Sequence, residues 1–162
     1  VKKTLLESHR VLKDEGLFLL HTIGRHTSAS SSYADSWITR YIFPGGHLPS
    51  AQQIHKAAEG YFRAEHMQNI GHDYDHTLMD WCVNFDTAWL HIKESMGEQL
   101  YGGMQKTHSG WPSFSDDEGI RFNRMWRYYL LSCAGAFRSG SIDLFQFVFS
   151  KGNPSKKYSF AR

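Results

Sequence analysis

The chain has 162 residues, of which 41% are hydrophobic and 21% are charged, and its formal net charge is +2. This composition is that of one ordinary globular domain, and the scattered basic residues offer no footprint for a nucleic-acid duplex. The sequence contains no run of roughly 20 apolar residues that could span a bilayer and no signal-peptide core, so we expect a soluble or at most peripheral protein.

The early part of the chain alternates between helical and extended patterns. Apolar residues predict a first helix over 5–12. Residues 17–24 read LFLLHTIG, which predicts a buried strand with His21 at its exit. Ligands of open α/β sheets lie at the carboxyl ends of the strands, so His21 is a candidate functional residue. A Ser-rich polar loop over 25–32 follows, and aromatic residues at helical spacing over 33–42 predict a short helix with the character of a lid.

The middle of the chain predicts a small helix over 50–59 and a second strand over 61–70. Asp73 and Asp75 are expected to open the clearest helix of the sequence, which carries one apolar stripe. The periodicity is lost near residue 97, where Gly, Gln and Ser accumulate. This composition predicts an inserted surface loop over about 97–114.

The last part predicts a second long amphipathic helix over 115–140 and a strongly apolar strand over 142–149. Strands that alternate with helices favour an α/β layered fold. A parallel sheet of three strands would leave an open edge, and such edges are normally paired or covered. Because the sequence opens at Val1 within a helical pattern, we expect the chain to begin partway through a larger protein, with partner strands before it.

Cys82 and Cys133 are the two cysteines of the chain, and each lies in an apolar helical pattern. Such positions suit reduced thiols in a core better than a disulfide framework. This usage indicates a reducing compartment.

Four ordered sequence blocks carry a family resemblance. They are LFLLHTIG at 17–24, WITRYIFPGGHLPS at 37–50, a segment at 65–81 that contains N-x-G-x-D-Y-D-x-T-L-M-x-W, and CAGAFR at 133–138. With these blocks the sequence resembles the C-terminal half of cyclopropane-fatty-acyl-phospholipid synthases, which are class I S-adenosylmethionine-dependent methyltransferases. The blocks occur in the family's order over nearly the whole chain.

The resemblance implies that residues 1–162 form the C-terminal part of a Rossmann-like methyltransferase sheet, with a helical lipid-binding lid over about 25–60. It implies transfer of a methyl group from S-adenosylmethionine to the cis double bond of an unsaturated phospholipid acyl chain, where it becomes the methylene of a cyclopropane ring. S-adenosylmethionine would be bound mainly by the N-terminal half, which this sequence lacks. Relatives with the same motifs also leave a methyl branch open as the product.

The resemblance also implies the site residues. A bound bicarbonate would be the base, held by His21, the backbone of Ile23 and Tyr74, with His21 and Tyr74 as catalytic residues. An imidazole and a phenol can both donate hydrogen bonds to an anion, so these residue types are compatible with that role. An acyl channel would be lined by aromatic side chains, although ordinary core packing is an alternative for them: Tyr33, Trp37, Tyr41 and Phe43.

The expected partner is a membrane phospholipid, met through peripheral contact at the cytoplasmic face of the membrane, and a homodimer is left open. A noncatalytic lipid-binding module remains an alternative, which the upstream coding sequence would test by the presence or absence of a strand and a Gly-rich cofactor turn. A metal-dependent hydrolase is a weaker alternative, because its ligands would lack any His-Glu-x-x-His or paired-Cys spacing. Those ligands would be His66, His72, Asp73, Asp75 and His76.

Overall fold

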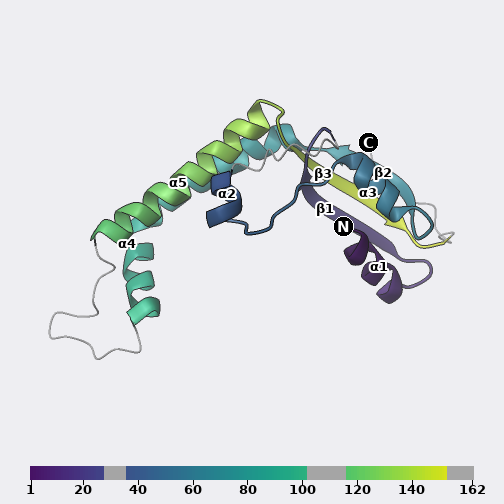
Figure 1. Cartoon of the computed structure of the whole chain (residues 1–162), viewed down its shortest axis with the longest axis horizontal. Helices are drawn as coiled ribbons and strands as arrows, with labels where there is room; N and C mark the ends of the chain where they lie inside the picture. The colour runs from purple at the N-terminus through teal and green to yellow at the C-terminus, as the bar shows by residue number, and fades with distance from the viewer. Residues whose placement is uncertain (28–35, 102–115, 153–162) are drawn as a thin grey trace. The chain divides into compact units, whose positions relative to one another are not determined.

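The computed structural model describes residues 1–27, 36–101 and 116–152 (Figure 1). It confirms an α/β fold of five helices and three strands in this part of the chain. Two compact units divide the chain: one comprises Val1–Tyr74 with Ala136–Arg162, and the other comprises Asp75–Gly135. The elements are α1 (Lys2–Val11), β1 (Leu17–Gly24), α2 (Ser36–Tyr41), α3 (Ala51–Ala58), β2 (Arg63–Asn69), α4 (Gly71–Tyr101), α5 (Asp116–Arg138) and β3 (Asp143–Ser150).

The three strands form one sheet in the order β1-β3-β2. Both β1 and β2 run antiparallel to β3, so β1 and β2 are parallel to each other. The direction of β3 follows from the chain path. The amide of Ile70, at the end of β2, donates to the carbonyl oxygen of Leu144, at the start of β3. The chain therefore re-enters the sheet after α4 and α5 at the end where it left, and β3 must run back.

The hydrophobic core lies on one face of this sheet. Phe145, Phe147 and Phe149 alternate along β3 and are at most 3% exposed. They pack with Leu5 of α1 and Ile54 of α3 in one buried cluster. An alternating phenylalanine pattern puts every second side chain on the same face, which explains why a single helical layer covers all three rings.

The expectation that β1 is a buried strand is wrong for the described structure. Its exposure alternates along the strand, and Leu17 and Leu19 are 47% and 56% exposed. Phe18 and Leu20 contact the core cluster instead. The physical reason is that α1 and α3 cover only the face that carries Phe18 and Leu20. Both faces of β1 carry apolar side chains, which produces the continuous apolar run, but only one of them is buried.

The Pro49-Ser50 pair predicts the start of a helix here, and α3 does begin after Ser50, with a capping box. The amide of Gln53 donates to Ser50 Oγ at 3.2 Å, and the Gln53 side chain accepts from the Ser50 amide at 3.0 Å. Ile54 is fully buried against the sheet. The later part of the predicted lid segment therefore belongs to the hydrophobic core, and a lid role stays a prediction only for residues before α3.

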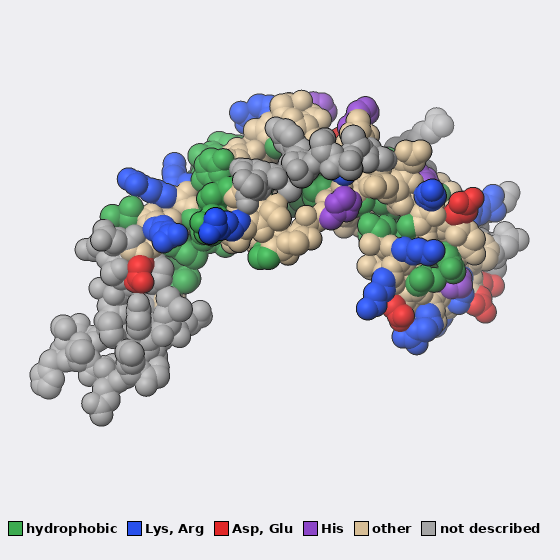
Figure 2. Space-filling model, in the orientation of Figure 1, with side chains coloured by type: hydrophobic (Ala, Val, Ile, Leu, Met, Phe, Trp, Pro, Cys, Tyr) green, Lys and Arg blue, Asp and Glu red, His purple; other side chains and the backbone are tan. Residues whose placement is uncertain are grey.

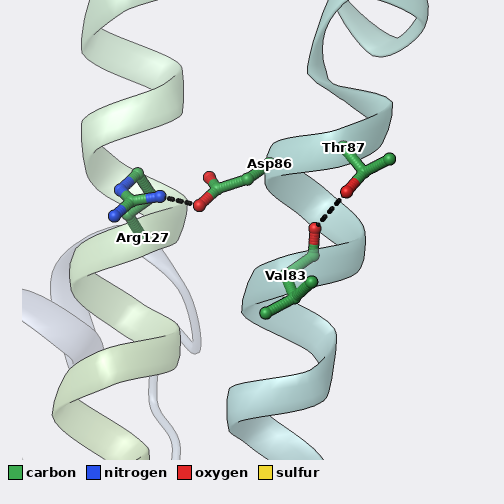
Figure 3. A network of polar contacts seen from close by, with 4 residues as sticks. All are labelled: Val83, Asp86, Thr87 and Arg127. Carbon is green, nitrogen blue, oxygen red and sulfur yellow. Dashed lines mark hydrogen bonds and ion pairs between the residues drawn. The ribbon is translucent and has the colours of Figure 1, made fainter.

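The long helices α4 and α5 pack through aromatic rings. The rings of Trp89 and Phe122 stack at 6.2 Å, and those of Phe85 and Trp126 lie 6.5 Å apart. Figure 3 shows Asp86 of α4 accepting from Arg127 of α5. Both helices were expected. Of the α4 stripe that was assigned to a core, Leu78 is buried and Phe85 contacts α5, whereas Trp81 is 47% exposed.

The start and end of α4 differ from the sequence prediction. The helix begins at Gly71 rather than at Asp73, because the side-chain oxygen of Asn69 accepts from the Gly71 amide at 3.0 Å. It continues to Tyr101, so the predicted surface loop does not begin at 97. Residues 102–115, the rest of that predicted loop, lie outside the described residues.

Both cysteines are free thiols in the structure, Cys82 in α4 and Cys133 in α5. Burial raises the pKa of Cys133 to about 11. The Cys133 thiol therefore stays protonated at neutral pH, which agrees with the expectation of reduced, structural cysteines.

Candidate active site

A row of polar side chains crosses the sheet on the face opposite the phenylalanine core. His21 of β1 and Gln68 of β2 both pair in register with Gln146 of β3. Directly opposed residues of antiparallel strands point to the same face, so the three side chains form one row. His21 and Gln68 are exposed, and Gln146 is half-buried.

A hydrogen bond joins two members of this row, between Gln146 Nε2 and His21 Nδ1 at 3.1 Å. An amide NH₂ group can only donate, so this contact makes Nδ1 the acceptor. A neutral His21 then carries its proton on Nε2, because one ring nitrogen accepts and the other donates. The Nε2–H group is the type of donor that an anion requires.

The row lies near the end of the sheet where β1 and β2 finish. Gly24 of β1 pairs with Asp143 at the start of β3. Asn69, the last residue of β2, donates from Nδ2 to the Asp143 carboxylate at 2.7 Å. The side-chain oxygen of Asn69 also accepts a hydrogen bond from the first amide of α4, that of Gly71. The carboxyl ends of β1 and β2 and the first turn of α4 therefore lie at the same edge of the sheet.

Tyr74 is the fourth residue of α4 and belongs to the same compact unit as His21. Its ring packs edge-on against Phe137 at 5.1 Å, and its side chain is half-buried. The Tyr74 ring therefore takes part in the packing at the start of α4. The predicted role of its hydroxyl in holding bicarbonate stays a prediction, and so does that of His21.

The backbone around Ile23 is closely packed. The Thr22 hydroxyl donates to the Ile23 carbonyl oxygen at 3.1 Å. A Cβ on Gly24 would lie only 2.6 Å from the Pro49 carbonyl oxygen and 2.5 Å from the Phe145 ring. The glycine is thus required by the close approach of two chain segments, and it fixes the path of the strand directly after the candidate anion-holding residues.

The structure describes three of the four predicted substrate-binding aromatics. The rings of Trp37 and Tyr41 on α2 lie 5.7 Å apart, and the Arg40 guanidinium lies 5.4 Å from the centre of the Tyr41 ring. Tyr41 and Phe43 are 43% and 53% exposed, which does not fit the alternative of core packing for these two. Tyr33 lies outside the described residues. A role of these aromatics in substrate binding stays a prediction.

The residues of the metal alternative are spread over two elements. His66 is on β2, and His72, Asp73, Asp75 and His76 are on α4. Asp75 is 5% exposed, and its Oδ1 lies 3.6 Å from His76 Nδ1. Among the described residues, no group of three or more His, Cys, Asp or Glu side chains is arranged to hold a metal ion.

Sequence reasoning missed Gln146 and Gln68. A signal was present for Gln146, because it is the polar residue within the run of phenylalanines at 145, 147 and 149. A polar side chain between alternating apolar ones predicts a face that is not buried. Gln68 carries no comparable signal, because its strand is polar along most of its length.

The family model described as mycolic acid cyclopropane synthetase matches residues 4–107. The chain is 43% identical over 143 residues to the cyclopropane-fatty-acyl-phospholipid synthase of Escherichia coli K12, covering 88% of this chain and 31% of that protein. It is 37% identical over 99 residues to the synthase of Citrobacter freundii, covering 61% of this chain and 86% of that sequence. The chain thus spans about a third of the length of the Escherichia coli relative.

Solved structures show the same fold. The cyclopropane synthase MmaA2 of Mycobacterium tuberculosis superposes with a TM-score of 0.68 at 23% identity, over 93% of this chain and 49% of that one. A coclaurine N-methyltransferase also gives a TM-score of 0.68, at 21% identity, over 93% of this chain and 42% of that one. The fold is therefore a partial class I methyltransferase fold. On the sequence matches, the chain belongs to the mycolic acid cyclopropane synthetase family.

Proposed function

We propose that this chain is the C-terminal, substrate-side part of an S-adenosylmethionine-dependent cyclopropane synthase that acts on unsaturated phospholipid acyl chains. Family membership supports the reaction class. The observation that carries the assignment of the site is the row of His21, Gln146 and Gln68 at the carboxyl ends of β1 and β2. Ligand sites of open α/β sheets lie at this end of the strands.

The residues of this chain would act by holding an anionic base, which we take to be bicarbonate. The Nε2–H group of His21 would donate one hydrogen bond to it, and the Tyr74 hydroxyl would donate another. Fixed donors keep such an anion in place without the cost of reorganising solvent during the reaction. The anion would then accept the proton that must leave the transferred methyl group before a ring can close.

S-adenosylmethionine, when bound, supplies the methyl group as an electrophilic sulfonium substituent. We assign its contacts mainly to the part of the relatives that this chain does not span. This chain covers 31% of the Escherichia coli protein, so that part makes up the other 69%. The aromatic side chains Trp37, Tyr41 and Phe43 would contact the acyl chain. We also propose peripheral contact with the cytoplasmic face of the membrane. In the parts of the chain that the structure describes, no helix is long and apolar enough to cross a membrane.

The test is methyl transfer by the complete protein that contains this chain. Unsaturated phospholipid vesicles and methyl-labelled S-adenosylmethionine should give labelled fatty acids that carry cyclopropyl protons in NMR spectra. Saturated phospholipid should give no labelled product. Labelled acids with a methyl branch would instead assign the other product class, and absence of label from unsaturated lipid would contradict the proposal and favour a noncatalytic lipid-binding module.

A further inference from the structure

The outward face of α5 combines arginines with large apolar side chains. Arg121 and Arg124 are exposed, and Ile120, Tyr128 and Leu131 are 51%, 49% and 42% exposed. Steps of three and four residues place these five side chains on one side of the helix. We call this set the α5 outer face. Over the region where Figure 1 draws α5, Figure 2 shows basic and hydrophobic side chains next to one another.

Side chains outside this face make the ring contacts and the ion pair between α5 and α4. The opposite side of α5 carries Phe122 and Trp126, whose rings pack on Trp89 and Phe85 of α4. Arg127, at the flank, is bound to Asp86. Arg121 and Arg124 make no ion pair with any residue in the described ranges. The exposed apolar side chains of the α5 outer face are therefore different from the aromatic side chains whose rings pack α5 on α4.

Beyond its first turn, α5 differs in charge from α4. The first turn of α5 carries Asp116, Asp117 and Glu118, and from residue 119 to 138 the helix contains arginines and no acidic residue. In contrast, α4 carries five acidic side chains over residues 71–96, with Lys93 as its basic residue. These acids are Asp73, Asp75, Asp80, Asp86 and Glu94. The part of α5 that follows its first turn is therefore basic, although the net charge of the whole chain is only +2.

We propose that the α5 outer face docks on an anionic phospholipid bilayer. Helices that lie in a membrane interface combine Lys or Arg with bulky apolar residues, and tyrosine is enriched at that depth. Arginine binds phosphate through two parallel hydrogen bonds, while its long stem lies along apolar surface. Ile120 and Leu131 would enter the acyl boundary between the headgroups that Arg121 and Arg124 bind.

Other occupants fit this surface less well. A second copy of the chain, related by a two-fold axis on this face, would place arginine against arginine at short range. A nucleic-acid duplex needs many phosphate contacts and gains little from exposed isoleucine and leucine. The inference rests on the proposed function, since a substrate within a bilayer is what requires the enzyme to dock there.

The test is vesicle binding by the complete protein. Mixed vesicles of saturated phosphatidylglycerol and phosphatidylcholine, above their melting temperature, present anionic headgroups but no double bond, so binding is measured without turnover. Arg121→Gln with Arg124→Gln should weaken binding about 30-fold, since one basic residue near an anionic surface contributes about fivefold. The variant should also show a smaller salt dependence. Unchanged binding would overturn the proposal.

The matched control is Lys13→Gln with Lys56→Gln, which removes the same charge from exposed positions elsewhere. It should bind the vesicles within about twofold of the unaltered protein, because neither lysine belongs to the α5 outer face. Equal weakening in both double variants would overturn the proposal, since net charge rather than this face would then drive binding. Circular dichroism should show intact helices in both.

A second pair of variants tests the apolar part. Ile120→Gln with Leu131→Gln retains helix propensity and should weaken binding several-fold even at high salt, where charge attraction is screened. Sedimentation should show the same oligomeric state for all variants. Loss of an oligomer with vesicle binding unchanged would identify the face as a subunit interface and overturn the proposal.

Methyl transfer to unsaturated phospholipid dispersed in neutral detergent separates this inference from the proposed function. The Arg121→Gln, Arg124→Gln variant should retain transfer in detergent and lose it on anionic vesicles. Equal transfer and binding by the variant and the unaltered protein would overturn only the docking surface. Absence of transfer in detergent by the unaltered protein, with vesicle binding still dependent on these arginines, would overturn only the proposed function.

Discussion

The proposed donor group of His21, Nε2–H, depends on a hydrogen bond between the ring and Gln146 of the neighbouring strand β3. The Gln146 amide occupies Nδ1, which leaves the proton on Nε2 in the neutral ring. The register that pairs the two residues is fixed along all of β1 and β3, from Leu17 with Ser150 to Gly24 with Asp143. The sheet register therefore brings together the two side chains whose hydrogen bond involves Nδ1 of a candidate catalytic residue.

We predict that His21→Ala in the complete protein lowers turnover by about 10²- to 10³-fold, the usual effect of losing one positioned donor to a catalytic anion. Lipid and cofactor binding should change much less, because the imidazole is exposed and carries no core packing. Turnover and binding constants measured side by side check this. His91→Ala, at an exposed position of α4, is the control and should leave turnover unchanged. Normal turnover in His21→Ala with a lower melting temperature would make His21 a structural residue.

Tyr74→Phe separates packing from hydrogen bonding at the start of α4. The ring contact with Phe137 remains in this variant, so stability should fall by only about 0.5 to 1.5 kcal/mol. If the hydroxyl holds the anion, turnover should fall sharply and become more dependent on added bicarbonate. Turnover against bicarbonate concentration is the measurement, with Tyr61→Phe as a control that should match the unaltered enzyme. Identical curves for Tyr74→Phe would remove this residue from the site.

At the scale of elements, Gly24 of β1 and Gly135 of α5 differ in the space around them, which is closely packed at Gly24 and open at Gly135. Gly24→Ala should destabilise the protein by about 1 to 3 kcal/mol, because the new methyl group would overlap the Pro49 carbonyl oxygen and the buried Phe145 ring. Gly135→Ala should stabilise it by about 1 kcal/mol, because it lies within a helix and a Cβ there meets nothing within 4 Å.

The two substitutions are chemically identical and change the unfolded chain equally, so their difference reports the folded structure alone. Melting temperature and urea midpoint are the measurements. A Gly24→Ala protein as stable as the Gly135→Ala protein would show that Pro49 and the strand can separate without cost. The tight packing at the end of β1 would then not define the backbone of the candidate site.

Element prediction from sequence succeeded where local chemistry decides the outcome. Helix α3 begins directly after Ser50, as expected, and the apolar segment at 142–149 forms β3. It failed at the ends of α4. The helix begins at Gly71 because Asn69, a strand residue bound to Asp143, supplies the acceptor for its first amide. That acceptor depends on a contact between residues 74 positions apart, which local pattern cannot contain.

At the scale of the whole molecule, the described sheet has one covered face and one open face. Leu17 and Leu19 are exposed on the open face, beside the polar row. The chain also covers only 49% of the MmaA2 structure that it matches. Stability, solubility and cofactor binding of this chain are therefore expected to depend on what covers that face.

We predict that the chain expressed alone shows no methyl transfer and little affinity for S-adenosylmethionine. In such folds, cofactor contacts come from the first βα units, and this chain covers only 49% of the MmaA2 structure that it matches. It should also be poorly soluble because of the open apolar face. Calorimetry and a transfer assay on the isolated chain check this, and tight stoichiometric cofactor binding would contradict it.

The sequence by itself determined the family, the order of the helices and strands, and the candidate residues His21 and Tyr74, because ordered motifs and local periodicity are written in neighbouring positions. The tertiary structure decided the direction of β3, the one-sided burial of β1 and the contact between Gln146 and His21. It also showed the α5 outer face, which becomes distinct only when the aromatic side of that helix is seen packed on α4. These features depend on pairing between residues far apart in the chain, and pairing is set by the packing of whole elements rather than by local sequence.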